Sequence, residues 1–142
     1  SKIHEHLGPD LTGLTFAIWG LAFKPETDDV REASALTVIS SLLNAGASVT
    51  AYDAKAMDTA KAALGEQANR VAFVDSMEAA VIDADALVVM TEWKEFRQPD
   101  LNSLATTLKT KTVFDGRNIY DPRVLAEHGL IHFGIGRGSY LL

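Results

Sequence analysis

The 142-residue sequence contains no cysteine, which excludes disulfides, thiolate metal sites and a thiol nucleophile within these residues. Long apolar runs are also absent: a typical one, Ala86 to Met90, is far shorter than the roughly 20 residues that a membrane-spanning helix needs. No basic segment precedes an apolar stretch with a small-residue cleavage site. We therefore expect no membrane segment and a cytoplasmic location.

The chain also has fewer basic than acidic residues. The chain has 13 Lys and Arg against 19 Asp and Glu, a formal net charge of -6. Because no local cluster of Lys and Arg offsets this charge, the chain is not expected to bind nucleic acid. The four histidines lack the spacing with carboxylates that metal ligands show. We therefore expect no metal site.

What is present favours one soluble α/β domain. Hydrophobic residues make up 47% and charged residues 23%, as in ordinary globular proteins, and the length suits a single core. Short apolar runs alternate with segments of helical spacing, which predicts a Rossmann-like open parallel sheet of about six strands with helices on both faces. The expected strands are 15–21, 47–52, 71–74, 86–91, 112–114 and 131–133. The expected helices are 36–43, 57–64, 77–82, 101–108 and 122–127.

The loop after the first expected strand is the first candidate for chemistry, because ligands of such sheets bind outside the carboxyl ends of the strands. A dinucleotide-binding loop would read G-x-G-x-x-G, but this chain has Gly20-Leu21-Ala22-Phe23-Lys24-Pro25. One glycine, a bulky Phe23 and the restriction that Pro25 places on Lys24 disfavour a close pyrophosphate cradle. Lys24 could bind a phosphate or carboxylate oxygen, or could be a solvated loop residue.

Asp53 follows the second expected strand and has two interpretations. A carboxylate at this point binds ribose hydroxyls in dinucleotide folds, but an Asp at a strand end is also a common turn former. The sequence alone leaves both open.

Three segments carry a family resemblance. The run from Trp19 to Glu32, WGLAFKPETDDVRE, closely resembles the opening of the C-terminal domain in the UDP-glucose/GDP-mannose dehydrogenase family. The segments TEWKEFR at 91–97 and FDGRN at 114–118 follow in the same order as in that family. The likeness covers about residues 11 to 137, and the residues of these motifs are most similar to those of bacterial UDP-glucose 6-dehydrogenases.

The resemblance implies an activity of a larger enzyme. Such enzymes oxidise UDP-glucose to UDP-glucuronate in two NAD-dependent steps through a catalytic cysteine, with an N-terminal NAD-binding domain and a long connecting helix at a homodimer interface. Residues 1–10 are then expected to be the end of that helix or a linker, and residues 11–142 the C-terminal UDP-sugar-binding domain. Because the cysteine and most of the NAD site would lie outside these residues, we expect the isolated chain to be inactive.

The resemblance also implies roles for individual residues. Phe23 and Lys24 match a pair that contacts the substrate, and Arg31 matches an arginine that reaches NAD across the cleft. Arg117 matches an arginine that reaches the nucleotide sugar in the neighbouring subunit's site. Its alternative role is that of a turn residue after Gly116.

Other interpretations stay open. GDP-mannose dehydrogenase and UDP-N-acetylhexosamine dehydrogenases share this architecture, and a free-standing nucleotide-binding regulatory module is a further alternative. A receiver-like signalling domain would need an Asp pair directly after the first strand, whereas Asp28 and Asp29 lie too far along the chain. For Trp93 and Phe96, packing is favoured over stacking on a base.

Overall fold

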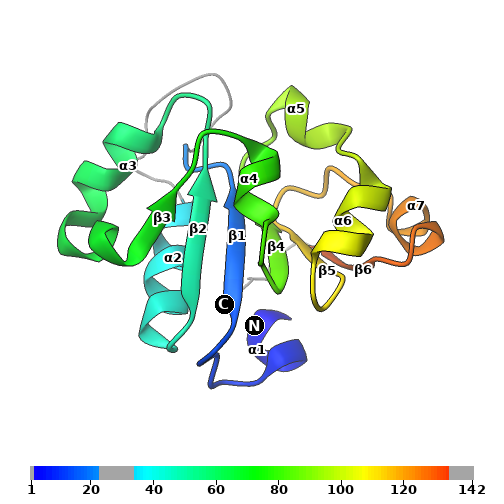
Figure 1. The fold of residues 1–142 in the computed structure, drawn as a ribbon, viewed down its shortest axis with the longest axis horizontal. Helices are drawn as coiled ribbons and strands as arrows, with labels where there is room; N and C mark the ends of the chain where they lie inside the picture. Colours follow the sequence, from blue (N-terminus) through cyan, green and yellow to red (C-terminus); the bar gives the residue numbers. More distant parts are fainter. Residues whose placement is uncertain (1, 23–33, 135–142) are drawn as a thin grey trace.

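The computed structural model describes residues 2–22 and 34–134, and these form a six-stranded parallel sheet covered by helices on both faces (Figure 1). The strand order is β3-β2-β1-β4-β5-β6, and every neighbouring pair is parallel. This arrangement confirms the expected Rossmann-like fold class. The strands are β1 (Thr15–Trp19), β2 (Ser48–Tyr52), β3 (Val71–Phe73), β4 (Ala86–Val89), β5 (Thr112–Asp115) and β6 (Ile131–Gly134).

The helices divide between the two faces of the sheet, as Figure 1 shows for α2 behind it and α4 in front. One apolar cluster joins the sheet to α1, α2 and α3, and a second joins it to α4, α5, α6 and α7. The helices are α1 (Lys2–Leu7), α2 (Ser34–Asn44), α3 (Met57–Leu64), α4 (Met77–Val81), α5 (Lys94–Arg97), α6 (Leu101–Thr107) and α7 (Pro122–Glu127), with a 3-10 helix η1 at Gly65–Arg70.

β1 lies inside the sheet and is buried on both faces. Phe16 and Ile18 belong to the cluster under α1 to α3, and Ala17 and Trp19 belong to the cluster under α4 to α7. This alternation follows from the two-residue period of a strand. A strand covered on both faces needs apolar residues at every position, and the continuous apolar pattern of this segment meets that need.

The structure corrects several expected boundaries. β1 ends at Trp19 rather than at residue 21, because Gly20 takes a left-handed backbone conformation with φ +98° that no strand can continue. α3 and α7 have the expected bounds. The short helices η1 and α5 were not expected.

The N-terminal segment packs on the sheet. Residues Lys2–Leu7 form α1, and Ile3 is fully buried in the same cluster as Leu11, with Leu7 packed against that cluster. The segment expected to be the end of a connecting helix or a linker is therefore a helix whose apolar side chain completes the core. Across residues 2–22 and 34–134, no helix has the length and apolar character needed to cross a membrane.

Candidate functional site

The candidate site lies where the strand order reverses. β2 and β4 flank β1, so the chain leaves the carboxyl ends of β1 and β4 toward opposite faces, which is the topological switch point of an open α/β sheet. The segments that follow β1, β2, β4 and β5 therefore meet along one edge. The described residues of these segments show how that edge is fixed.

The backbone after β1 approaches β4 very closely. A Cβ added at Gly20 would lie 2.5 Å from the Cβ of Thr91 and 2.6 Å from its backbone nitrogen. Thr91 is fully buried, and its hydroxyl donates a hydrogen bond of 2.7 Å to the carbonyl of Ala22. Only glycine fits such a gap without displacing the neighbouring strand end, so this glycine has a packing role at the switch point.

Asp53 fixes the same backbone from the other side. It follows β2, is fully buried, and its carboxylate accepts hydrogen bonds of 2.8 to 3.3 Å from four backbone amides and one indole. These donors belong to Leu21, Ala22, Lys55, Ala56 and Trp93. A carboxylate enclosed by protein donors cannot also face ribose hydroxyls. The structure therefore supports the turn-forming interpretation of Asp53.

Asp53 and Thr91 together hold Leu21 and Ala22, the last described residues before the loop that carries the first site residues. Phe23, Lys24 and Arg31 lie outside the described residues, and their roles stay predictions. The fixed backbone shows where their segment starts, at the carboxyl edge of β1 and beside the ends of β2 and β4.

The described residues do not fit an NAD site of the dinucleotide-binding type. Such a site needs glycines that let the pyrophosphate approach the loop after β1 and an acidic side chain free to bind ribose. Here Thr91 occupies the space next to Gly20, and the carboxylate of Asp53 accepts hydrogen bonds from backbone amides.

Arg117 lies at the same edge, in the turn after β5. Its Nε donates a hydrogen bond of 2.9 Å to the carbonyl of Met90, the first residue after β4, and its backbone amide donates to Oδ1 of Asp115 at 3.2 Å. The side chain is thus directed back across the end of β4 toward the switch point. The structure therefore brings Arg117 close to the segment that follows β4.

Asp115 organises this turn. It is fully buried, and besides the amide of Arg117 its carboxylate accepts from the amide of Tyr120 at 2.9 Å and from Nε2 of His132 at 3.1 Å. Burial alone would raise the pKa of this carboxyl, but the hydrogen bonds from His132 and from backbone amides outweigh burial and lower the pKa below its ordinary value. Asp115 is therefore held as a carboxylate.

His132 contacts the candidate site, and the sequence alone did not point to that contact. It lies on β6 opposite Val113, and Asp115 follows Val113 by two residues, so His132 and Asp115 are on the same side of the sheet. The side chain of His132 is 8% exposed and that of Asp115 is completely covered. The sequence indicates that His132 and Asp115 are neighbours only when the register of β5 and β6 is known.

The aromatic residues after β4 serve packing, as expected. Trp93 is 9% exposed and Phe96 is fully buried, and Phe96 stacks on Trp19 with ring centroids 5.3 Å apart. The hydroxyl of Tyr120 donates a hydrogen bond to the carbonyl of Phe96, and burial raises the pKa of Tyr120. The turn after β5 is thereby joined to the segment after β4.

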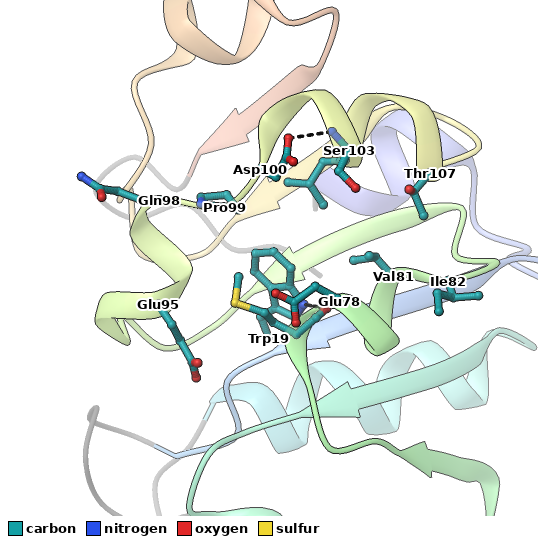
Figure 2. Close-up of a pocket in the computed structure, with 12 residues that line it drawn as sticks. Trp19, Glu78, Val81, Ile82, Glu95, Gln98, Pro99, Asp100, Ser103 and Thr107 are labelled. Atoms are coloured by element: carbon teal, nitrogen blue, oxygen red, sulfur yellow. Dashed lines mark hydrogen bonds between the residues drawn. The ribbon is translucent and has the colours of Figure 1, made fainter.

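A separate groove of about 300 Å³ runs between α4 and α6 (Figure 2). Figure 2 shows Val81 and Ile82 on the α4 side and Ser103 and Thr107 on the α6 side, and Trp19 also lines the groove. Its rim carries three carboxylates, those of Glu78, Glu95 and Asp100, and none of its described lining residues is Lys or Arg. Such a rim repels anionic ligands.

The described residues also contain no group of three or more His, Asp or Glu that could hold a metal ion.

A family model described as the UDP binding domain of the UDP-glucose/GDP-mannose dehydrogenase family matches residues 17–122. The chain is 48% identical over 127 residues to a UDP-glucose 6-dehydrogenase of Pseudomonas aeruginosa, covering 88% of this chain and 28% of that protein. A solved UDP-glucose dehydrogenase of Pyrobaculum islandicum aligns with a TM-score of 0.70 and 35% identity, over 85% of this chain and 26% of its own.

A solved NDP-N-acetyl-D-galactosaminuronic acid dehydrogenase of Methanosarcina mazei aligns with a TM-score of 0.76 and 26% identity, over 93% of this chain and 26% of its own. The chain thus spans between a quarter and three-tenths of the length of these relatives. Each match lies within that part of the relative.

Proposed function

The chain belongs to the UDP-glucose/GDP-mannose dehydrogenase family as its UDP-binding domain, and from this we propose that it forms the nucleotide-sugar-binding part of a UDP-glucose 6-dehydrogenase. In the whole enzyme, UDP-glucose and two NAD would give UDP-glucuronate and two NADH. Residues 11–142 would bind the substrate, and an N-terminal domain of the same enzyme, joined through residues 1–10, would hold most of the NAD and the catalytic cysteine. A cytoplasmic homodimer is part of this proposal.

The observation that carries the proposal is that Arg117 and the described start of the segment leading to Lys24 lie at the same edge of the sheet. The segment that leads to Lys24 starts from backbone that Asp53 and Thr91 fix, and Arg117 is directed toward the same edge by its hydrogen bond to Met90. Lys24 and Arg117 would then supply two cations for an anionic diphosphate. This domain would supply binding energy that holds the sugar in place, rather than a reacting group.

The resemblance assigns the contacts further. Phe23 and Lys24 would contact the substrate, Arg31 would reach NAD across the cleft, and Arg117 would reach the nucleotide sugar bound in the neighbouring subunit's site. The domain would then contribute to two sites at once.

The test is a calorimetric titration of UDP and of NAD into this chain, with its oligomeric state measured at the same concentration. We expect weak UDP binding that Lys24→Ala reduces by about tenfold or more, because a charge-assisted hydrogen bond is lost. Arg117→Ala should reduce it as well in the dimer. NAD should bind little, and the pure chain should form no NADH from UDP-glucose and NAD.

Matched surface variants control for net charge. Lys109 and Arg123 are exposed and lie outside the proposed contacts, so Lys109→Ala and Arg123→Ala should leave UDP binding unchanged. Binding of NAD without binding of UDP would overturn the proposal and indicate a cofactor domain. Tight UDP binding without any partner domain would instead favour a free-standing nucleotide-binding module.

A related dehydrogenase is the second candidate, favoured by the likeness to the NDP-N-acetyl-D-galactosaminuronic acid dehydrogenase of Methanosarcina mazei. Competition titrations with UDP-glucose, UDP-N-acetylhexosamines and GDP-mannose separate these candidates. Equal displacement by UDP and by both UDP sugars would place sugar selection outside this domain, whereas a preference for GDP-mannose would overturn the assignment to UDP.

A further inference from the structure

We infer that the edge strand β6 takes part in the candidate site through His132, which acts as a positioning residue for Arg117. The inference rests on the proposed function for its biological meaning, because Arg117 is the residue proposed to bind the nucleotide sugar. Its structural content is independent: removing the side chain of His132 should change how the guanidinium of Arg117 is held.

The contacts run in an unbroken series across three strands. His132 on β6 contacts Oδ2 of Asp115 on β5 at 3.1 Å, and Oδ1 of the same carboxylate accepts from the backbone amide of Arg117 at 3.2 Å. The side chain of Arg117 then donates to the carbonyl of Met90 after β4 at 2.9 Å. The orientation of one carboxylate therefore couples the edge strand to the arginine.

The imidazole of His132 restricts rotation of the Asp115 carboxylate more than the backbone amides would alone. Oδ1 of Asp115 receives the amide of Arg117, and Oδ2 receives the amide of Tyr120 together with the imidazole of His132. The backbone amide of Ile119 is a further donor to this carboxylate, and one orientation satisfies all of these donors. Without His132, Asp115 can turn about its terminal torsion, and the amide of Arg117 loses its fixed acceptor.

The absence of a side chain at Gly134 makes room for this arrangement. Gly134 is the register partner of Asp115, and a Cβ added there would lie 3.1 Å from Cε1 of His132 and 2.7 Å from Oδ1 of Asn118. Asn118 belongs to the same turn as Arg117 and has a left-handed backbone with φ 54°. The end of β6 is thus shaped around both the imidazole and the turn.

The test observes Arg117 directly. The Nε–Hε signal of Arg117 is followed by NMR in this chain for the wild type and for His132→Leu, His132→Gln and Gly134→Ala. We expect His132→Leu to shift the signal and speed its hydrogen exchange, because the hydrogen bond to Met90 is held less firmly. His132→Gln retains an amide donor and should restore most of the wild-type signal, which loss of packing alone would not explain.

His128→Gln is the matched control. His128 is half-buried just after α7 and contacts the carbonyl of Val124, away from the turn that holds Arg117, so its replacement should leave the Arg117 signal unchanged. If His132→Leu fails to fold, Gly134→Ala retains the imidazole while crowding it, and should shift the same signal. An unchanged Arg117 signal in a folded His132→Leu or Gly134→Ala protein would overturn the inference.

Binding of UDP is measured in the same samples. Where wild-type protein binds UDP, His132→Leu should weaken binding by about 3- to 10-fold, and His132→Gln by less, consistent with one disturbed hydrogen bond. If UDP does not bind to wild-type protein at all, the proposed function fails. The response of the Arg117 signal then still decides whether His132 positions that residue.

Discussion

Gly20 and Thr91 are in contact across the junction of β1 and β4, so close that a Cβ on Gly20 would overlap the side chain and the backbone of Thr91 at 2.5 to 2.6 Å. The hydroxyl of Thr91 then reaches past this contact to the carbonyl of Ala22. The two strand ends are thereby joined at the switch point, just before the chain continues toward Phe23 and Lys24. The geometry of the proposed site depends on this contact.

Replacement of Gly20 by Ala should destabilise the protein by about 2 kcal/mol or more, from the left-handed backbone and from the overlap with Thr91. Chemical denaturation measures the free energy of unfolding. Gly13→Ala is the matched control, because Gly13 also has a left-handed φ, of +85°, but a Cβ there would have no atom within 4 Å. Equal losses in the two variants would show that the contact with Thr91 has no energetic role.

Asp53→Asn should be strongly destabilising although it changes only one atom. Both carboxylate oxygens face N–H donors, so either orientation of the amide places an NH2 group against a buried donor. We expect a loss of about 2–4 kcal/mol in the free energy of unfolding. Asp75→Asn, on an exposed residue, is the control and should change stability by less than about 0.5 kcal/mol. A similar cost for both variants would contradict this account of Asp53.

The hydrogen-bonded carboxylate of Asp115 predicts a dependence of stability on acid pH. Its pKa is lowered in the folded protein, so below the ordinary value of 3.8 the unfolded chain binds a proton that the folded protein resists. This contribution is fully present above that pH and is lost as the pH falls through the folded pKa. In Asp115→Asn, the free energy of unfolding should therefore fall less steeply with pH below about pH 4. Denaturation curves at a series of acid pH values measure this slope, and an unchanged slope in the variant would contradict the prediction.

Much of the fold could be predicted because it depends on local patterns. Apolar runs identified all six strands, and Pro122 together with helical spacing placed α7 with correct bounds. η1 and α5 were missed, since helices of only six and four residues have no recurring apolar spacing to recognise. The end of β1 was placed two residues too late, because an apolar residue after Gly20 continues the pattern while the backbone has already turned.

The candidate site was less accessible, because its contacts join residues far apart in the chain. Asp53 receives amides from Leu21 and Ala22, and nothing in the local sequence distinguishes those donors from ribose hydroxyls. The contact of His132 with Asp115 depends on the register of two strands. The family resemblance pointed to Arg117, but its anchor on Met90 became visible only with the structure.

Two tyrosines at the carboxyl edge of the sheet allow a last comparison. The hydroxyl of Tyr120 donates to the buried carbonyl of Phe96, whereas that of Tyr52 donates to the exposed carboxylate of Glu95 at 3.1 Å. Tyr120→Phe should cost about 1–2 kcal/mol in the free energy of unfolding, because a buried acceptor loses this donor. Tyr52→Phe should cost less, since water can replace the lost hydroxyl at Glu95.

Alkaline titration tests the same two tyrosines. Burial first, and then the nearby charge of Glu95, raises the pKa of Tyr52 to about 12, and burial raises that of Tyr120 as well. The folded protein therefore retains these protons above the ordinary value of 10.0, and the stability that they contribute is present below that pH and lost as the pH rises above it. Absorbance of the phenolate, followed with the unfolding signal, should show both tyrosines ionising late or together with unfolding. Ionisation of Tyr52 near pH 10 in folded protein would mean that its hydroxyl is not held against Glu95.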